Sequence, residues 1–208
     1  MKNEMLRIFD DNNQLIGQAS RAEVHRLGYW HETFHCWFIS HEAAKDYIYL
    51  QLRSLDKEDY PDLFDITAAG HLLADETVGD GIREVEEELG VKVKREELIS
   101  IGKIHYQAYK EEFIDKEIAH VFIYETPYKI SDYQLQLEEV AGIVCVDFNH
   151  FYNFCFGKTN SFLAEGFICQ GGVKSIFKDD ITYNSLVPHE LSFYQQVVER
   201  IKQYLNRR

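Results

Sequence analysis

The sequence predicts an α+β fold in which helices flank a mixed β-sheet. Segments rich in strand-forming residues and segments with helical periodicity follow one another without a regular strand–helix–strand alternation. Of the 208 residues, 45% are hydrophobic and 14% are aromatic, which is enough apolar material for a substantial core. The chain contains no internal repeat, low-complexity tract or Pro/Gly/Ser-rich linker. We therefore expect one domain over residues 1–208.

The first part of the chain is expected to consist mainly of strands. Residues 5–9 and 14–18 flank the turn sequence DDNNQ, a pattern typical of a β-hairpin. A short helix is expected over 20–27, ending near Gly28. Three further strands follow, at 29–39, at 46–53 and, as a short strand leading into the loop at Gly70, in the sequence LFDITAAG.

The second part combines strands with a C-terminal helix. Strands are expected at 98–109 and 117–125, joined by the charged turn KEEFIDK, and at 140–147, followed by a short helix near 148–156. Residues 157–188 show no clear periodicity. A helix from about 189 to 206 has one apolar stripe, formed by Leu191, Tyr194, Val197, Val198, Ile201, Tyr204 and Leu205. We interpret this C-terminal helical extension as a packing element or the contact of a homodimer.

Charge and cysteine usage limit the classes of partner. A formal net charge of −13 argues against a nucleic-acid or anionic membrane surface, whereas a phosphate substrate stays compatible because bound metal ions can supply positive charge. The four cysteines, Cys36, Cys145, Cys155 and Cys169, are scattered without a C-x-x-C pair, and buried reduced thiols are expected. The N-terminus lacks the apolar core of a signal peptide and no window resembles a membrane span, so we expect a cytoplasmic protein.

The chain is organised around the stretch GHLLADETVGDGIREVEEELGV, residues 70–91. Thr77 and Asp80 form a T-x-x-D capping box, which predicts Thr77 as the N-cap of a helix over 78–89 that Gly90 ends. Val78, Ile82, Val85 and Leu89 fall on one apolar stripe of this helix. Gly79 and Gly81 weaken its first turn by about 1 kcal/mol each.

Three carboxylates of this helix cluster on another face. Glu84, Glu87 and Glu88 stand at i, i+3 and i+4. Like charges at this spacing repel one another, and anions near a helix C-terminus oppose the helix dipole. A solvated acidic face is one interpretation. The other is a divalent cation, because hard oxygen ligands at this spacing suit Mg²⁺ or Mn²⁺.

The flanking residues favour the cation. Gly70, Glu76 and the sequence Arg83-Glu84-Val85-x-Glu87-Glu88-x-Gly90-Val91 resemble the Nudix box of pyrophosphohydrolases. There is one departure, since six residues separate Glu76 from Arg83 where the family pattern has seven. The resemblance implies a Nudix-type α/β/α sandwich with a mixed sheet and a core of about 30–150. It does not extend to the N-terminal hairpin and the C-terminal helix.

The resemblance also implies a function and a site. The function is Mg²⁺- or Mn²⁺-dependent cleavage of a diphosphate linkage in a nucleoside diphosphate-type or related small molecule. Glu84, Glu87 and Glu88 would bind metal, and one of them would double as the catalytic base. Arg83 would fix one of these carboxylates, and Glu76 would help to orient the loop. Gly70, His71 and Glu117 are expected at the substrate. A further carboxylate could come from a distant loop, with Glu111, Glu112, Glu117, Glu138 and Glu139 as candidates.

A second resemblance concerns histidines. His25, His31, the Gly70-His71 pair, Asp115 and Glu117 are similar to the metal site of isopentenyl-diphosphate isomerases, which share the Nudix fold. In those enzymes a cysteine directly before the Gly-His pair transfers the proton, but this chain has Ala69 there. An isomerase-like enzyme and a non-catalytic nucleotide-sensing module are therefore the alternatives to a hydrolase. Core packing is expected of the nearby aromatic residues Trp30, Phe34, Trp37, Tyr106 and Tyr109 rather than base stacking.

Overall fold

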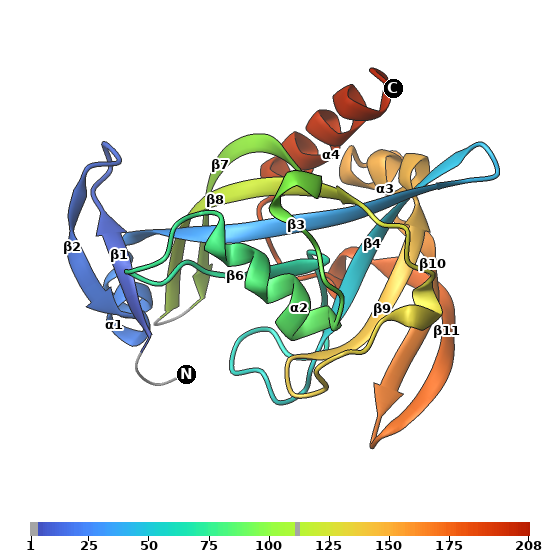
Figure 1. The fold of residues 1–208 in the computed structure, drawn as a ribbon, viewed down its shortest axis with the longest axis horizontal. Coiled ribbons are helices and arrows are strands. Elements are labelled where there is room, and N and C mark those ends of the chain that lie inside the picture. The colour runs from blue at the N-terminus through green and yellow to red at the C-terminus, as the bar shows by residue number, and fades with distance from the viewer. Residues whose placement is uncertain (1–3, 111–112) are drawn as a thin grey trace.

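The computed structural model describes residues 4–110 and 113–208, and Figure 1 shows their fold. Within these residues one mixed sheet is formed by β1 (Met5–Phe9), β2 (Leu15–Ser20), β3 (Trp30–Glu42), β4 (Lys45–Arg53), β5 (Phe64–Asp65), β6 (Ala68–His71), β7 (Leu98–Lys110), β8 (Phe113–Glu125), β9 (Val140–Asp147), β10 (Ser161–Gln170) and β11 (Val173–Thr182). The helices are α1 (Arg21–Leu27), α2 (Arg83–Leu89), α3 (Phe148–Cys155) and α4 (Leu191–Leu205). Short 3₁₀ turns lie at Asp80–Ile82, Arg95–Glu97, Ile130–Asp132 and Tyr183–Ser185.

Strand β3 is the centre of this sheet. It runs parallel to β8 over most of its length, from the pair Trp30–Lys116 to the pair Ile39–Glu125. It is antiparallel to β1, β4 and β6. The sheet is therefore mixed, as expected.

Hydrophobic side chains of β3 are buried on both faces of the sheet. Trp37 and Ile39 pack in a core with residues of α3 and α4, including Phe151 and Phe193. Cys36 and Phe38, which alternate with them, pack in a second core with Val85 and Leu89 of α2. Figure 1 shows α2 and the α3–α4 pair on different sides of the sheet. This α/β/α arrangement confirms the predicted fold class.

The β7–β8 hairpin corrects the predicted turn. The sequence FIDK was placed in a charged loop, but Phe113–Lys116 pair with residues 107–110 and belong to β8. Asp115 is turned toward His25 and His31, although its Oδ1 has no hydrogen-bond partner among the described residues. Residues 111–112, which include the candidates Glu111 and Glu112, lie outside the described residues.

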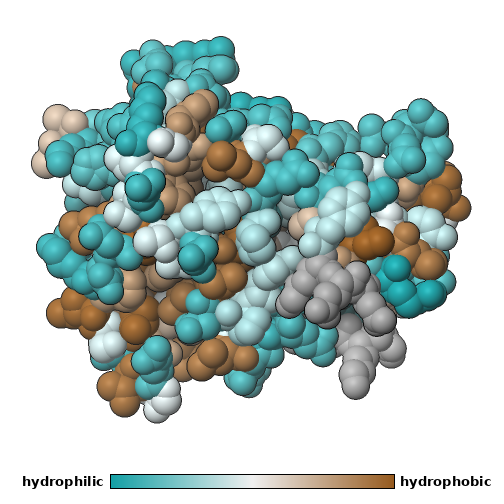
Figure 2. Space-filling view, turned by 180° about the vertical axis from the view of Figure 1, so that it is seen from behind, coloured by the Kyte–Doolittle hydropathy of each residue, from teal (hydrophilic) through white to brown (hydrophobic). Residues whose placement is uncertain are grey.

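The stretch 157–188, which shows no clear periodicity in its sequence, contains strands β10 and β11. They form an antiparallel hairpin, and β10 extends the sheet by pairing with β9. The C-terminal helix α4 then buries Phe193, Val197 and Ile201 against the α3 side of the sheet, so it is a packing element. Seen from behind, hydrophobic residues gather on the side of the β10–β11 hairpin (Figure 2), where Val173 and Ile176 are exposed.

The remaining sequence expectations are met in part. Helix α1 ends at the C-cap Gly28, as expected, and has Ser20 as its N-cap. All four cysteines are free thiols, of which Cys36 and Cys155 are buried whereas Cys145 and Cys169 are half-buried. No helix among the described residues is long and apolar enough to cross a membrane.

Candidate active site

The segment from β6 to α2 brings the predicted site residues together. Strand β6 pairs with β3, which places Gly70 opposite Phe34. A Cβ atom on Gly70 would lie 2.1 Å from Glu84 Oε1, so the backbone approaches this carboxylate more closely than a side chain permits. Gly81 is equally confined, because its Cβ would lie 2.6 Å from Phe34 Cβ.

Helix α2 begins later than the sequence predicted. Thr77 N and Oγ1 do donate to Asp80 Oδ2, at 2.8 and 2.7 Å, so the two residues of the capping box interact. However, residues 80–82 form a 3₁₀ turn and the α-helix starts at Arg83, so Thr77 is not its N-cap. Gly79 and Gly81 account for the difference, because glycine disfavours the first turn of an α-helix. The C-terminal end is as predicted, with Gly90 in the left-handed conformation at φ 67°.

The Arg83 guanidinium holds several carboxylates of this segment. It donates through Nε to Glu76 Oε1 at 2.5 Å. Through Nη1 it donates to Glu84 Oε1 at 2.6 Å and to Glu87 Oε2 at 3.0 Å. A further bond runs from Nη2 to the carbonyl of His71, at 3.2 Å. The side chain thus ties the loop, the end of β6 and the acidic face of α2 to one another.

Glu84 and Glu88 are the two carboxylates of this face whose ionised forms are destabilised by burial. Glu88 is buried, and its Oε2 accepts hydrogen bonds from Gln51 Nε2 at 3.2 Å and from Ala69 N at 3.1 Å. Burial raises the pKa of Glu84 to about 7 and that of Glu88 to about 8. Glu87 is more exposed. Desolvated carboxylates of this kind are stabilised by a hard divalent cation, which the donor set fits.

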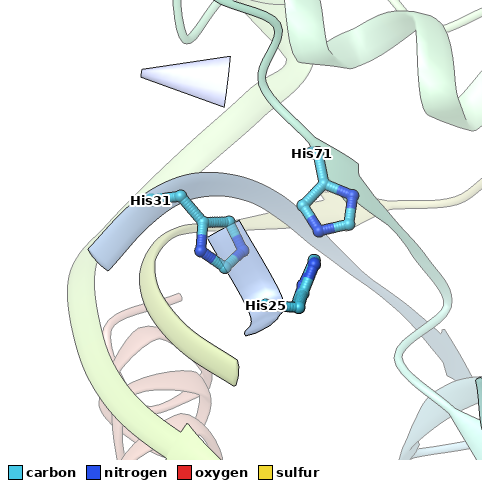
Figure 3. Close-up of side chains that lie close together, drawn as sticks. All are labelled: His25, His31 and His71. Carbon is cyan, nitrogen blue, oxygen red and sulfur yellow. The ribbon is translucent and has the colours of Figure 1, made fainter. Parts of the chain in front are cut away.

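Three imidazole rings form a second cluster. His25 of α1, His31 of β3 and His71 of β6 have ring centroids 5.0 to 5.3 Å apart, and Figure 3 shows the rings converging. Asp115 Oδ1 lies 3.5 Å from Nε2 of both His25 and His31. The set His25, His31 and His71 and the set His31, Asp115 and Glu117 are each compact enough to hold one metal ion.

The environment prepares these histidines for ligation. His25 Nδ1 and His31 Nδ1 are hydrogen-bonded to the carbonyls of Arg21 and Tyr29, at 2.8 and 3.2 Å, which leaves each Nε2 facing the cluster. Burial lowers the pKa of His31 and of His71, which favours the neutral form that binds metals. Burial alone would also lower the pKa of His25, but Asp115 raises it. Among the described residues, His31 Nε2 has no hydrogen-bond partner.

Glu117 lies buried beside this cluster. It accepts hydrogen bonds from Thr33 Oγ1 at 2.7 Å and from His35 Nε2 at 2.9 Å. Burial alone would raise the pKa of Glu117, but the hydrogen bonds from His35 and Thr33 hold it well below its usual range. This carboxylate is therefore ionised at neutral pH.

One cavity of about 600 Å³ joins the two clusters. Its wall includes most of the residues predicted for the site, namely Gly70, His71, Glu76, Arg83, Glu84, Glu87, Glu88, Glu117 and Glu139. Glu138 is exposed and does not line it. Of the aromatic residues, Phe34 and Trp37 are buried in the core as expected, and Tyr106 is buried at the cavity wall. Tyr109 departs from the expectation because it is 66% exposed.

Several other residues of the cavity wall were not predicted from the sequence. Lys57 forms an ion pair with Glu139. Arg53 donates to Asp65 Oδ2 at 3.0 Å, and Asp65 Oδ1 accepts from His189 Nε2 at 3.0 Å. These residues belong to a polar loop, to strand ends and to the segment before α4. No periodic pattern marks them, and only the folded chain brings them together.

Comparisons with known proteins place this geometry in context. No family model matches the chain. An uncharacterised Nudix hydrolase of Clostridium acetobutylicum is 39% identical over 202 residues, which cover 97% of this chain and 98% of that protein. Isopentenyl-diphosphate Delta-isomerase 1 of Photorhabdus laumondii is 26% identical over 122 residues, or 58% of this chain and 68% of that enzyme. The crystal structure of a MutT protein from Methanosarcina mazei shares the fold, with a TM-score of 0.53 and 17% identity over 83% of this chain and 95% of that one.

Proposed function

The chain belongs to the Nudix hydrolase family, and we propose that it is a divalent-metal-dependent pyrophosphohydrolase of a small-molecule diphosphate. Family membership makes it a hydrolase of phosphoanhydride bonds. The metal dependence, the substrate class and the residue roles are the proposal. We take the substrate to be a nucleoside diphosphate-type compound or a related small molecule.

The acidic face of α2 is the observation that carries the proposal. Glu84 and Glu88 are desolvated carboxylates whose pKa is raised by burial, and Glu87 lies beside them on the same cavity. Such a group destabilises the metal-free protein, and a cation removes that cost. We assign Mg²⁺ or Mn²⁺ to these carboxylates. When bound, the ion supplies the positive charge that a diphosphate needs in an acidic cavity.

The chain's own residues have three tasks in this reaction. Arg83 fixes the rotamers of Glu84 and Glu87 through its hydrogen bonds. Gly70 leaves free space where a side chain would collide with Glu84. A carboxyl group whose pKa lies near the working pH is suited to take a proton from the attacking water, a condition that Glu84 and Glu88 both meet.

Hydrolysis assays with matched variants test this function. The purified protein is incubated with Mg²⁺ and a panel of nucleoside diphosphate compounds, and released phosphate products are measured. We expect Glu87→Gln and Glu88→Gln to lower kcat at least about 100-fold. Glu86→Gln is the control, because Glu86 belongs to the same helix but is exposed, pairs with Lys92 and does not line the cavity. Full activity in the Glu87 and Glu88 variants would sink the proposal.

The histidine cluster favours a second candidate, an isomerase-like enzyme that acts on prenyl diphosphates. His25, His31, His71, Asp115 and Glu117 converge as the resemblance implied. Against it stands Ala69, which brings no thiol to the site. The assay is conversion of isopentenyl diphosphate to its allylic isomer in the presence of Mn²⁺ and Mg²⁺. Turnover there, together with failure to hydrolyse any diphosphate, would favour the isomerase over the hydrolase.

A further inference from the structure

The C-terminal part of the chain contributes to the same cavity. Before α4 begins, the chain returns to the sheet, where Leu186 forms a parallel bridge with Phe64 and Val187 N donates to the carbonyl of Phe64 at 2.9 Å. Tyr194 of α4 donates to the carbonyl of Val187 at 2.8 Å and fixes the segment from the other side. Val187 and His189 both line the cavity that contains the acidic face of α2.

The imidazole of His189 is held in one orientation. Its Nε2 donates to Asp65 Oδ1 at 3.0 Å, and Asp65 also accepts hydrogen bonds from Arg53 Nη1 and from the backbone N of Ile66. Although Asp65 is buried, the hydrogen bond from His189 and the Arg53 charge hold its pKa far below the usual range. The acceptor is therefore a carboxylate, so the proton of this hydrogen bond belongs to His189 Nε2.

Aromatic rings also pack against the imidazole of His189. Tyr106 stands perpendicular to it at a centroid distance of 5.1 Å. Phe193 and Tyr194 contact it at 5.0 and 5.5 Å. The imidazole thus packs against aromatic rings on several sides, and its Nε2 is hydrogen-bonded to Asp65.

The other ring nitrogen, Nδ1, is the subject of the proposal below. Within residues 4–110 and 113–208, His189 Nδ1 has no hydrogen-bond partner, although the side chain is only 8% exposed. With the proton on Nε2, Nδ1 of the neutral ring is an acceptor. Nδ1 is not one of the fully buried atoms that lack a partner, so solvent reaches it, and a donor on a ligand in the cavity would replace that solvent. A role limited to tying α4 to the sheet needs the bond to Asp65 but does not require the ring to line the cavity.

We propose that His189 is a substrate-contacting residue that recognises the organic group attached to the diphosphate, by accepting a hydrogen bond from one of its O–H or N–H groups at Nδ1. This inference rests on the proposed function, since it assumes a diphosphate held at the acidic face of α2. It defines the substrate class more closely. The organic group carries a hydroxyl or N–H donor, as sugars and nucleosides do, and is not a pure hydrocarbon.

Two non-hydrolysable probes test the contact by calorimetry in the presence of Mg²⁺. α,β-Methylene-ADP carries a diphosphate analogue with hydroxyl and amino donors, whereas methylenediphosphonate is the diphosphate analogue alone. We expect the wild-type protein to bind α,β-methylene-ADP more tightly. His189→Ala and His189→Gln should each lose about tenfold in affinity for it, the order expected for one hydrogen bond, and should bind methylenediphosphonate as the wild type does. The Gln variant can still donate to Asp65, which protects its fold.

Ser192→Ala is the matched control, since it removes an exposed hydrogen bond to Glu190 from the same segment without altering the imidazole. It should leave both affinities unchanged. A ¹⁵N-histidine NMR spectrum gives a second readout, because the Nδ1 resonance of His189 should move with α,β-methylene-ADP and stay in place with methylenediphosphonate.

The inference is overturned if the wild type does not distinguish the probes, or if the His189 variants keep the difference or lose affinity for both probes equally. Its failure is separable from that of the hydrolase proposal. Binding that depends on His189 without any turnover would refute only the proposed reaction. Suppose that turnover requires Glu87 and Glu88 but not His189, and that the His189 variants keep the difference in affinity between the two probes. This result would refute only the proposed His189 contact.

Discussion

Arg83 donates to Glu76 through Nε at 2.5 Å, although the segment between them is one residue shorter than in the Nudix pattern. The 3₁₀ turn at residues 80–82 offers a physical account. A 3₁₀ turn rises by about 2.0 Å per residue and an α-helix by about 1.5 Å, so three residues of 3₁₀ turn recover about 1.5 Å, the rise of one α-helical residue. The contact between Arg83 and Glu76 is thereby kept.

Glu76→Gln should lower activity through Arg83. The amide removes the negative charge that anchors the guanidinium. Arg83 then becomes more mobile and positions Glu84 and Glu87 less well. We expect kcat to fall about tenfold with little change in KM, and the free energy of unfolding to fall by about 1 kcal/mol, because this ion pair is partly exposed. Steady-state kinetics and urea unfolding measure both. Unchanged kcat would show that Glu76 does not position the catalytic face.

Glu88→Gln should stabilise the metal-free protein at pH 8. The pKa of folded Glu88 is raised by burial to about 8, so its contribution to stability is fully present below the unfolded pKa and is lost as the pH rises toward 8. An amide has no charge to desolvate, and its oxygen can still accept from Gln51 and Ala69. We expect Tm to rise by a few degrees, at about 2–4 °C per kcal/mol for a chain of this size.

Mg²⁺ should make the wild type more stable than Glu88→Gln, the reverse of the order expected without metal. The ion stabilises the carboxylate of the wild type, so Tm of the wild type should rise on addition of Mg²⁺ by more than that of Glu88→Gln. Thermal unfolding at pH 5 and pH 8, with and without Mg²⁺, provides the comparison. An equal Mg²⁺ response of both proteins would contradict metal binding at Glu88.

Local pattern was sufficient for most elements and for the acidic helix. Alternation and composition predicted the strands other than β10 and β11, and Gly90 predicted the end of α2. The convergence of His25, His31 and His71 followed from resemblance, and no local pattern implies it. Local pattern was misleading where tertiary contacts decide. Asp115 looked like a loop residue because a charge disfavours a strand, yet it lies in β8 and faces histidines from α1 and β3.

Residues from distant parts of the chain could not be predicted to meet. Asp65 and His189 are 124 positions apart, and their contact depends on the way residues 186–189 return to β5. Neither residue belongs to a motif. The start of α2 was missed for another reason, since the capping box formed its bonds but the two glycines did not support an α-helical turn.

Asp65→Asn should destabilise the protein in a pH-dependent manner. The folded pKa of Asp65 lies below the unfolded value, so its stabilisation is present above about pH 4 and is lost as the pH falls further. At pH 7 we expect a loss of about 3 kcal/mol, because Arg53 and His189 lose a buried anion. Urea unfolding from pH 7 to pH 3 should show that the difference in free energy of unfolding between the wild type and Asp65→Asn becomes smaller. Asp180→Asn, an exposed position on β11, is the control and should show no such difference at any pH.

Gly70→Ala should strongly lower kcat without unfolding the protein. A Cβ at this position would lie 2.1 Å from Glu84 Oε1 and 2.7 Å from Oε2, so the carboxylate has to leave its place beside Arg83. Because the displaced group is the end of a side chain, the cost in stability is expected to be about 1–2 kcal/mol, whereas kcat should fall about 100-fold. The double variant Gly70→Ala/Glu84→Asp tests the cause, since the shorter acid leaves room for the methyl group. Its kcat should exceed the product of the two single effects. A Gly70→Ala enzyme with full activity would show that Glu84 need not remain where the structure has it.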